Sequence, residues 1–202
     1  MPGIQIRFFM NYKFFLIGLK NIILNPVKAW ETIDSENKKV KVIRDSFLFP
    51  LIILVSISAV AGSLIFTNTE LSTVFSIFVG VRTFIVLLFT IYATSLIFGE
   101  ITFPLDLGKD FTISLRIIVY SVTPFLMCQI LSGIFESLLF VNVIGLYGLY
   151  IFWTGVDKLL SPPQYKKMPL LIATTISMIV IYVATNMLLT KLVERIFYAF
   201  FD

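Results

Sequence analysis

Few residues in this sequence could do chemistry. There is no histidine, and Cys128 is the one cysteine. This composition excludes histidine-dependent catalytic triads, metal sites built from histidine and cysteine, and disulfide bonds within the chain. The acidic candidates are Glu100, Asp106 and Asp110, which lie close to Lys109. We expect a solvated loop here, with a cation site or a carboxylate pair as the alternative.

Motifs that carry enzymatic chemistry are also missing from the sequence. It contains no H-E-x-x-H, G-x-S-x-G or G-x-G-D pattern, no Walker-type loop and no G-x-G-x-x-G after a strand. We therefore predict a protein that is not an enzyme and that has no catalytic residue, metal site or cofactor.

The stretch RIIVYSVTPFLM, residues 116–127, places a proline inside an apolar run. Pro124 cannot donate a hydrogen bond to the carbonyl of Tyr120, and lipid offers that carbonyl no partner. The hydroxyls of Ser121 and Thr123 are within reach of it. The stretch therefore predicts a bent helix with a polar strip. The bend serves packing alone, or it creates a cavity or a partner surface.

Two arginines also lie within apolar runs. Arg116 comes one turn before Tyr120, and we expect its side chain to reach the cytoplasmic surface. Arg82 falls about eight residues inside its span, where a charge should face the bundle and be paired. Its candidate partners are Glu70 and Glu136. Three amides could complete a polar cluster in the outer half: Gln129, Asn142 and Asn186. The alternative role for this cluster is hydrogen bonding that holds helices together.

Small residues mark the faces where helices should approach closely. Gly145, Gly148 and Gly155 form such a face in one apolar run, and Ser58 and Gly62 form another. These patterns predict a compact helical bundle.

The composition indicates the class of protein whose helices hold the residues described above. The chain has 202 residues, of which 58% are hydrophobic and 14% are charged, with a mean hydropathy of +0.95. A soluble protein carries about 25% charged residues. The sequence therefore predicts an all-α integral membrane protein.

Five apolar runs are long enough to cross a bilayer, which requires about 20 residues. We place the five transmembrane helices at 47–66, 74–98, 112–132, 138–156 and 169–190. They make one membrane domain, residues 47–190, followed by a short tail, residues 191–202.

The first 46 residues are predicted to be a basic cytoplasmic segment. Within residues 4–24, Lys13 and Lys20 share one helical face, which favours an amphipathic helix lying in the membrane interface. A sixth span is the alternative. Asn25 and Pro26 predict the start of a short helix, on which Trp30 would anchor at the lipid headgroups.

The charge distribution sets the expected orientation. Residues 1–46 contain eight Lys or Arg against four acids, an excess that equals the net charge of +4 of the whole chain. With the N-terminus inside, internal segments hold twelve cations and external segments hold two. The positive-inside rule then predicts a cytoplasmic N-terminus and an external C-terminus. Anionic lipid, and not nucleic acid, is the expected partner of the basic segment, although Lys38–Arg44 fits a solvated linker equally well.

Three motifs together resemble the Yip family of multi-span membrane proteins and its bacterial branch. They are NPVKAWETI (Asn25–Ile33), LRIIVYSVTPFL (Leu115–Leu126) and YGLYIFWTGVDKLLSPPQYKK (Tyr147–Lys167), and their order and spacing agree with the family. The resemblance implies five spans, a cytoplasmic N-terminal region and no known catalysis. Eukaryotic members are linked to Rab-type GTPases and vesicle traffic.

We therefore expect a non-enzymatic adaptor, scaffold or complex subunit of a bacterial inner membrane. Its expected partners are the lipid bilayer and other membrane proteins, or further copies of itself. The alternative is a small-solute or ion transporter or channel that uses the bent third span and the two arginines. An enzyme acting on lipids is a third and weaker hypothesis, because no nucleophile with an adjacent base is visible.

Overall fold

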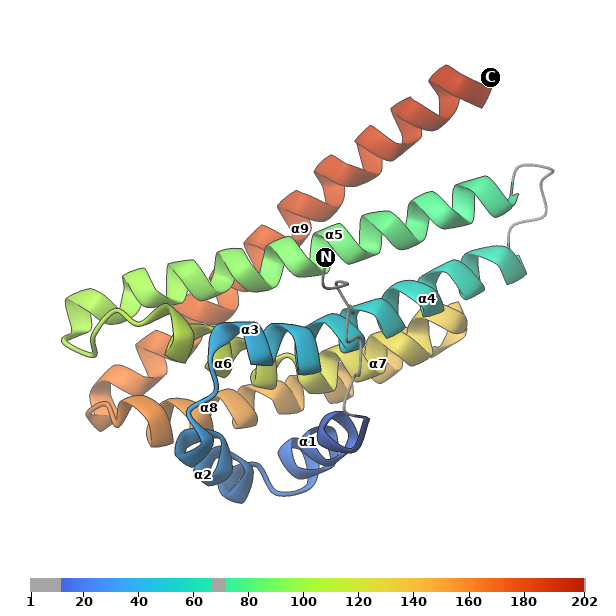
Figure 1. Ribbon diagram of the computed structural model, residues 1–202. Helices are drawn as coiled ribbons and strands as arrows, with labels where there is room; N and C mark the ends of the chain where they lie inside the picture. Colours follow the sequence, from blue (N-terminus) through green and yellow to red (C-terminus); the bar gives the residue numbers. More distant parts are fainter. Residues whose placement is uncertain (1–11, 67–71, 202) are drawn as a thin grey trace, which may run out of the picture.

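A computed structural model describes residues 12–66 and 72–201. Every regular element in these two segments is helical (Figure 1). The elements are α1 (Tyr12–Leu24), α2 (Pro26–Glu36), α3 (Val40–Ile43), η1 (Arg44–Leu48), α4 (Phe49–Phe66), α5 (Ser72–Thr102), η2 (Phe103–Leu105), α6 (Phe111–Ser121), α7 (Thr123–Ile134), η3 (Glu136–Leu146), α8 (Tyr147–Leu160) and α9 (Gln164–Phe201).

The described helices include several that are long and apolar enough to cross a membrane. Four are unbroken: Val40–Phe66, Thr73–Leu105, Ser137–Leu160 and Gln164–Phe197. The pair α6 and α7 makes a fifth span if it counts as one bent helix. The predicted fold class, an all-α membrane bundle, is therefore confirmed.

Some helix bounds differ from the ranges expected from hydropathy. The first apolar helix begins at Val40, seven residues before the expected start, because α3 and η1 continue directly into α4. The last one begins at Gln164, although Pro169 was expected to start it. Pro169 is tolerated because the carbonyl it leaves free belongs to Tyr165, which is exposed in the first turn.

A π-helical turn, η1, joins α3 to α4. The N–H of Phe49 bonds the carbonyl of Arg44, five residues back, and Pro50 follows. Proline cannot take part in the regular ladder, so the shifted bonding occurs just before it. This turn directs Phe47 into the protein, where its side chain is fully buried.

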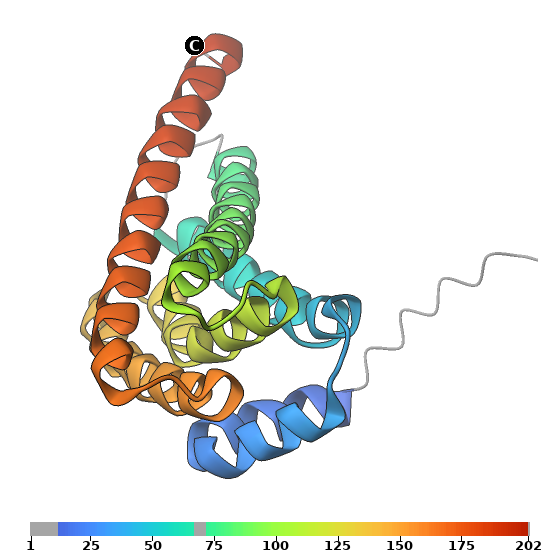
Figure 2. The same cartoon turned by 90° about the vertical axis from the view of Figure 1, so that its left-hand side faces the viewer.

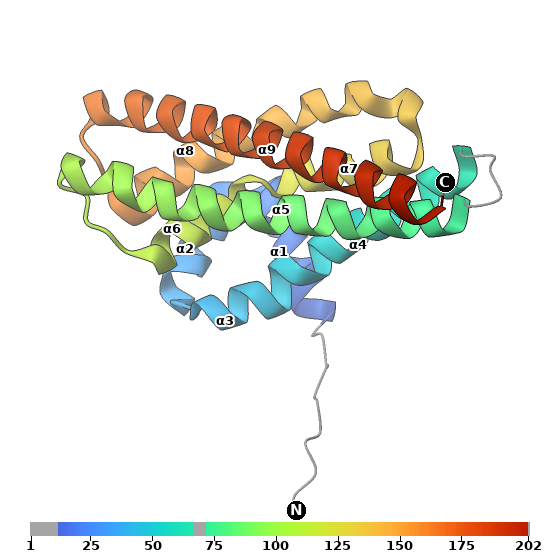
Figure 3. The same cartoon turned by 90° about the horizontal axis from the view of Figure 1, so that it is seen from above.

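The spans pack as neighbours in a defined order. Helix α4 packs on α5 and α7, α5 also packs on α6 and α9, and α6 packs on α8. The 3₁₀ segment η3 packs on α7 and leads into α8. Helix α9 runs alongside α5 at the periphery of the bundle (Figure 3).

Helices α1 and α2 form a unit that we call the head, residues 12–36. Figure 2 shows the head on one side of the bundle and α9 at the edge of it. The described part of helix α1 buries Phe15, Leu19 and Ile22. Residues 4–11 of the expected amphipathic helix and the side chain of Lys13 lie outside the described part.

The start of α2 is built as the sequence predicts. The side-chain oxygen of Asn25 accepts a hydrogen bond from the N–H of Lys28 at 3.3 Å, and Pro26 occupies the first turn. The helix ends where Asn37 adopts a left-handed conformation with φ of 38°. Asparagine tolerates that conformation better than most residues. The turn at Asn37 leads the chain toward α3.

Candidate functional site

The third span is bent where the sequence predicts. Helices α6 and α7 meet at 43°, with Val122 between them and Pro124 in the first turn of α7. The hydroxyl of Thr123, at the start of α7, donates a hydrogen bond across the break to the carbonyl of Val119 in α6 at 3.0 Å. The hydroxyl of Ser121 is buried and has no hydrogen-bond partner in the segments 12–66 and 72–201.

The predicted glycines pack against this bend. A Cβ on Gly148 would lie 2.3 Å from the carbonyl oxygen of Ser121, and one on Gly145 would lie 3.0 Å from the Cα of Phe125. Real Cβ contacts are essentially never shorter than 3.0 Å. The two glycines therefore allow η3 and α8 to approach the main chain of the bent span.

A cavity of about 260 Å³ lies beside the bend. The helices α5 to α9 all contribute to its lining. Examples are Thr90 of α5, Ser121 of α6, Phe125 of α7, Gly148 of α8 and Tyr182 of α9. Most of the remaining lining is aliphatic or aromatic. Of the residues singled out in the sequence, Ser121, Asn142, Gly145 and Gly148 line the cavity, whereas Thr90 and the residues of α9 were not singled out for it.

An aromatic cluster connects the head to the bundle. Tyr120 meets Phe47 at a ring distance of 4.7 Å and Trp30 at 5.7 Å, the latter edge-on. Phe15 of α1 packs on Phe47 at 5.9 Å. Such contacts add about 0.5–1.5 kcal/mol per pair beyond the area they bury. Tyr120 thus contacts the head directly before the bend.

Trp30 does not anchor at lipid headgroups as expected. Its indole is fully buried within the protein, and its N–H donates to the carbonyl of Ile151 at 3.0 Å. A Cβ on Gly155 would lie 2.5 Å from the indole, so this glycine provides the space for the ring. The anchoring rule considers a helix alone, whereas here α8 supplies both the space and the acceptor.

Arg116 does not reach the surface as expected. Its side chain is 3% exposed. One guanidinium nitrogen, Nη2, donates to Oδ1 of Asn37 at 2.7 Å and to the carbonyl of Lys38 at 2.5 Å. The link between α2 and α3 supplies these two acceptors, whereas Nε is buried and has no partner among the described residues. Arg116 therefore fastens this link to the third span.

Arg82 is half-buried and bonds to the last span. Its Nη1 donates to the hydroxyl of Thr190 at 2.9 Å, and that hydroxyl donates to the carbonyl of Asn186 at 2.7 Å. The expected partners Glu70 and the side chain of Glu136 lie outside the described part. Among the three amides expected nearby, Asn142 accepts from Ser132 at 3.3 Å. The described contacts thus hold α5 to α9.

The acidic candidates have structural roles. Asp110 caps α6, because its Oδ1 accepts from the N–H groups of Thr112 and Ile113 at 2.6 and 3.2 Å. Glu100 pairs with Lys109, and Asp106 is almost fully exposed. Within the described residues, no three His, Cys, Asp or Glu side chains come together in a way that could hold a metal ion.

Some important contacts were missed by the sequence analysis. Lys167 is 4% exposed, donates to Asp157 at 2.5 Å and lies over the ring of Trp153 at 5.6 Å. Its neighbour Lys166 donates to the carbonyl of Leu105 at 2.7 Å. A pair of lysines near a helix start gives no signal that one of them is buried. These bonds fix the start of α9.

These features define an α-helical multi-pass membrane protein with a bent span, a cavity beside the bend and a head attached to both. A family model described as the Yip1 domain matches residues 20–187. Because this match covers most of the chain, the protein belongs to the Yip1 domain family, and the resemblance seen in the motifs is confirmed. Comparisons with curated proteins and with solved structures gave no match.

Proposed function

We propose that the protein is a non-enzymatic membrane adaptor or scaffold whose last span, α9, binds another integral membrane protein. The observation that carries this proposal is the exposure of α9. In its most apolar stretch, 11% of the residues are buried, whereas the three other unbroken spans bury 33–44%. A span with this much free surface is available for a partner helix.

The outward face of α9 forms one continuous apolar stripe. Its exposed members recur at spacings of three and four: Ile172, Ile176, Val180, Val183 and Met187. This spacing places them on one helical face. Exposed charges follow the stripe at Lys191, Glu194 and Arg195. A partner helix can cover the apolar stripe and also pair with the charged side chains. Lipid tails can cover the stripe but cannot pair with the charges.

The cavity supports a non-enzymatic role. Among the described residues that line it, there is no Asp, Glu, Lys, Arg, His or Cys side chain. The hydroxyls of Thr90 and Ser121 therefore have no adjacent base that would activate them as nucleophiles. The Yip1 domain family is also not known for enzymatic activity.

A photocrosslinking experiment tests the adaptor proposal. A benzophenone amino acid replaces Val180 on α9 or, as the control, Ile57 on the exposed face of α4, with side chains 59% exposed in both cases. We expect protein adducts from Val180 in native membranes and lipid adducts alone from Ile57. Differently tagged copies distinguish a second copy from another protein. Lipid adducts alone from both positions, with a monomeric particle in mild detergent, would contradict the proposal.

A second candidate function is transport of a small solute or ion. The cavity beside the bent span is the observation that favours it, because transporters bind substrates at broken helices near the membrane centre. However, neither Arg82 nor Arg116 lines this cavity. Substrate-dependent flux into liposomes that disappears in Arg116→Ala, with wild-type folding, would favour transport over the adaptor role.

A further inference from the structure

The cavity beside the bend lies at a defined depth within the spans. Thr90 is near the middle of the helix Thr73–Leu105, and Ser121 is near the middle of the bent pair that runs from Phe111 to Ile134. Both line the cavity. In a hydrocarbon core of about 30 Å, the middle of a span lies about 15 Å from either boundary. The cavity therefore lies near the midplane.

Within the part of the chain that the structure describes, the hydroxyls of Thr90 and Ser121 have no hydrogen-bond partner, and the two residues are 1% and 7% exposed. Some nearby hydroxyls bond their own helices, as Ser95 does with the carbonyl of Ile91 at 2.7 Å, whereas the hydroxyl of Thr94 has no partner among the described residues. The hydroxyl of Thr123 donates to the carbonyl of Val119. An unpaired polar group is costly in hydrocarbon. Both oxygens are closed off from the cavity as they stand, so each side chain would turn about χ1 to donate to an occupant that accepts hydrogen bonds.

The size and walls of the cavity fit a ring. Its volume of about 260 Å³ exceeds the ~150 Å³ of an engineered apolar cavity that binds benzene. Aromatic side chains face it from three helices: Phe125, Phe152 and Tyr182. Phe125 and Tyr182 already meet edge-on at 6.4 Å. Aromatic walls and an uncharged lining favour a flat, uncharged molecule.

We propose that this cavity binds an uncharged, lipid-soluble carbonyl compound of the quinone type, with ring oxygens that accept hydrogen bonds from Thr90 and Ser121. A glycerolipid fits less well, because its ester carbonyls lie at the hydrocarbon boundary while its acyl chains carry no acceptor. An ionic ligand would find no charged group in the lining. This inference is independent of the adaptor role of α9.

The test uses the full chain in phosphatidylcholine nanodiscs, so that acyl chains compete in excess. A photoreactive azidoquinone is crosslinked, and the adducts are mapped by mass spectrometry. We expect adducts on cavity-lining residues such as Leu146, Leu149 and Met178, which excess decylubiquinone suppresses. Adducts spread over the outward residues Ile176, Val180 and Leu188, without suppression, would overturn the proposal.

Variants test the role of the hydroxyls. We define specific labelling as the azidoquinone labelling that excess decylubiquinone suppresses. Thr90→Val combined with Ser121→Ala should lower this specific labelling about fivefold or more, as expected for the loss of one or two hydrogen bonds. Thr90→Ser should retain it. The matched control is Thr94→Val, because the Thr94 hydroxyl is also buried and unpaired but does not line the cavity. Equal losses in Thr94→Val and Thr90→Val would overturn the assignment.

A variant that fills the cavity provides a second test if the protein with Thr90→Val and Ser121→Ala folds poorly. Thr175 lines the cavity from α9, and Thr175→Phe would occupy the space of the ring. If this variant elutes from a size-exclusion column and unfolds thermally like the wild type, it should lose the labelling that excess decylubiquinone suppresses. Full labelling of a folded Thr175→Phe protein would show that the quinone binds elsewhere.

Discussion

The indole N–H of Trp30 donates a hydrogen bond to the main-chain carbonyl of Ile151 at 3.0 Å, across 121 residues of sequence. The same indole packs edge-on against Tyr120, which lies directly before the bend. One side chain of the head therefore contacts both the bent span and the helix that packs on the bend.

The first prediction concerns this contact. Trp30→Ala should lower the free energy of unfolding by about 3–5 kcal/mol, because it empties a fully buried site. Trp30→Phe should cost less, since Ile151 keeps a second donor, the hydroxyl of Thr154 at 3.0 Å. Thermal unfolding in detergent measures both changes. Val27→Ala is the control, because Val27 lies three residues away on α2 and is 51% exposed. Equal stability of Trp30→Ala and Val27→Ala would contradict the structural role of the indole.

The second prediction concerns the close approach of α8 to the bend. Gly148→Ala should destabilise the protein by about 1–3 kcal/mol or more, because the new methyl group would meet a main-chain oxygen that cannot rotate away. Gly99→Ala is the matched control: its Cβ would be 3.4 Å from the nearest atom, an ordinary contact, inside the long helix α5. Thermal unfolding should separate the two variants. If Gly148→Ala melts like Gly99→Ala, the helices are not held at this distance.

The third prediction concerns the link between α2 and α3. Arg116→Ala removes the donor to Asn37 and to the carbonyl of Lys38, so the link should open more often. The loss of hydrogen bonds from a charged donor is worth about 1.5–3 kcal/mol, which predicts cleavage by trypsin after Lys38 and Lys39 that is about ten- to a hundredfold faster. Arg44→Ala is the control, because its guanidinium pairs with the adjacent Asp45 on the surface and lies over the ring of Phe49 at 5.5 Å. Unchanged cleavage in Arg116→Ala would refute this role.

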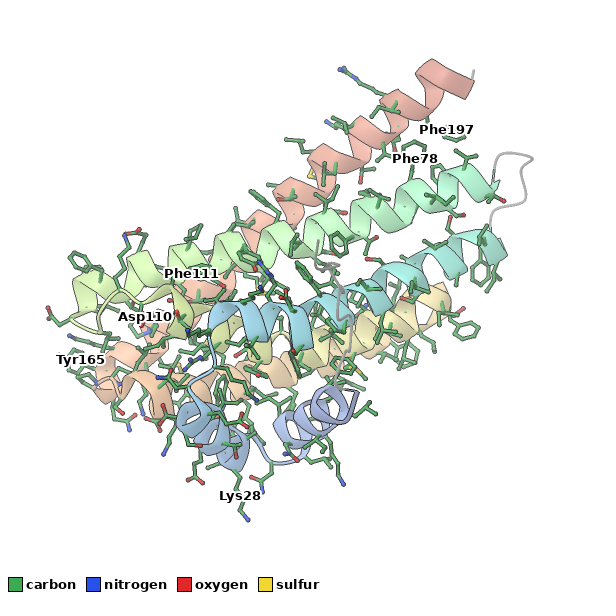
Figure 4. All side chains as sticks on the ribbon, viewed as in Figure 1. Lys28, Phe78, Asp110, Phe111, Tyr165 and Phe197 are labelled. Atoms are coloured by element: carbon green, nitrogen blue, oxygen red, sulfur yellow. The ribbon has the colours of Figure 1, made fainter. Side chains whose placement is uncertain are left out.

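The fourth prediction concerns orientation in the membrane. In a Cys128→Ala background, Lys28→Cys should be protected from an impermeant maleimide in intact cells, while Asp202→Cys should react. Lys28 projects from α2 away from the bundle, so access to it is limited by the membrane and not by packing (Figure 4). The basic first segment drives this expectation through the positive-inside rule. Reaction of both cysteines, or of neither, would indicate an even number of spans.

Local patterns were sufficient for the features that depend on neighbouring residues. Pro124 predicted the bend, Asn25 and Pro26 predicted the start of α2, and the glycine spacing predicted a close helix approach. Each follows from the chemistry of the main chain within one or two turns. These features therefore depend little on where the rest of the chain lies.

The features that the sequence did not predict depend on distant partners. General rules direct an interfacial tryptophan and a terminal arginine toward headgroups. Trp30 and Arg116 instead point inward, because α8 and the α2–α3 link supply acceptors from residues 121 and 79 positions away. Thr90 was also missed, because hydroxyls in helices usually bond their own main chain and give little signal.

The peripheral position of α9 has a consequence for how the protein assembles during synthesis. The earlier helices already pack on one another, α4 on α5 and α7 and α6 on α8, whereas α9 packs mainly on α5. Since chains emerge from the ribosome in sequence order, a four-span core can form before α9 enters the bilayer. Helix α9 then supplies the last wall of the cavity, including Tyr182. Until it docks, the side of the cavity that α9 covers is open to the membrane, and a lipid-soluble molecule can enter there without passing through water.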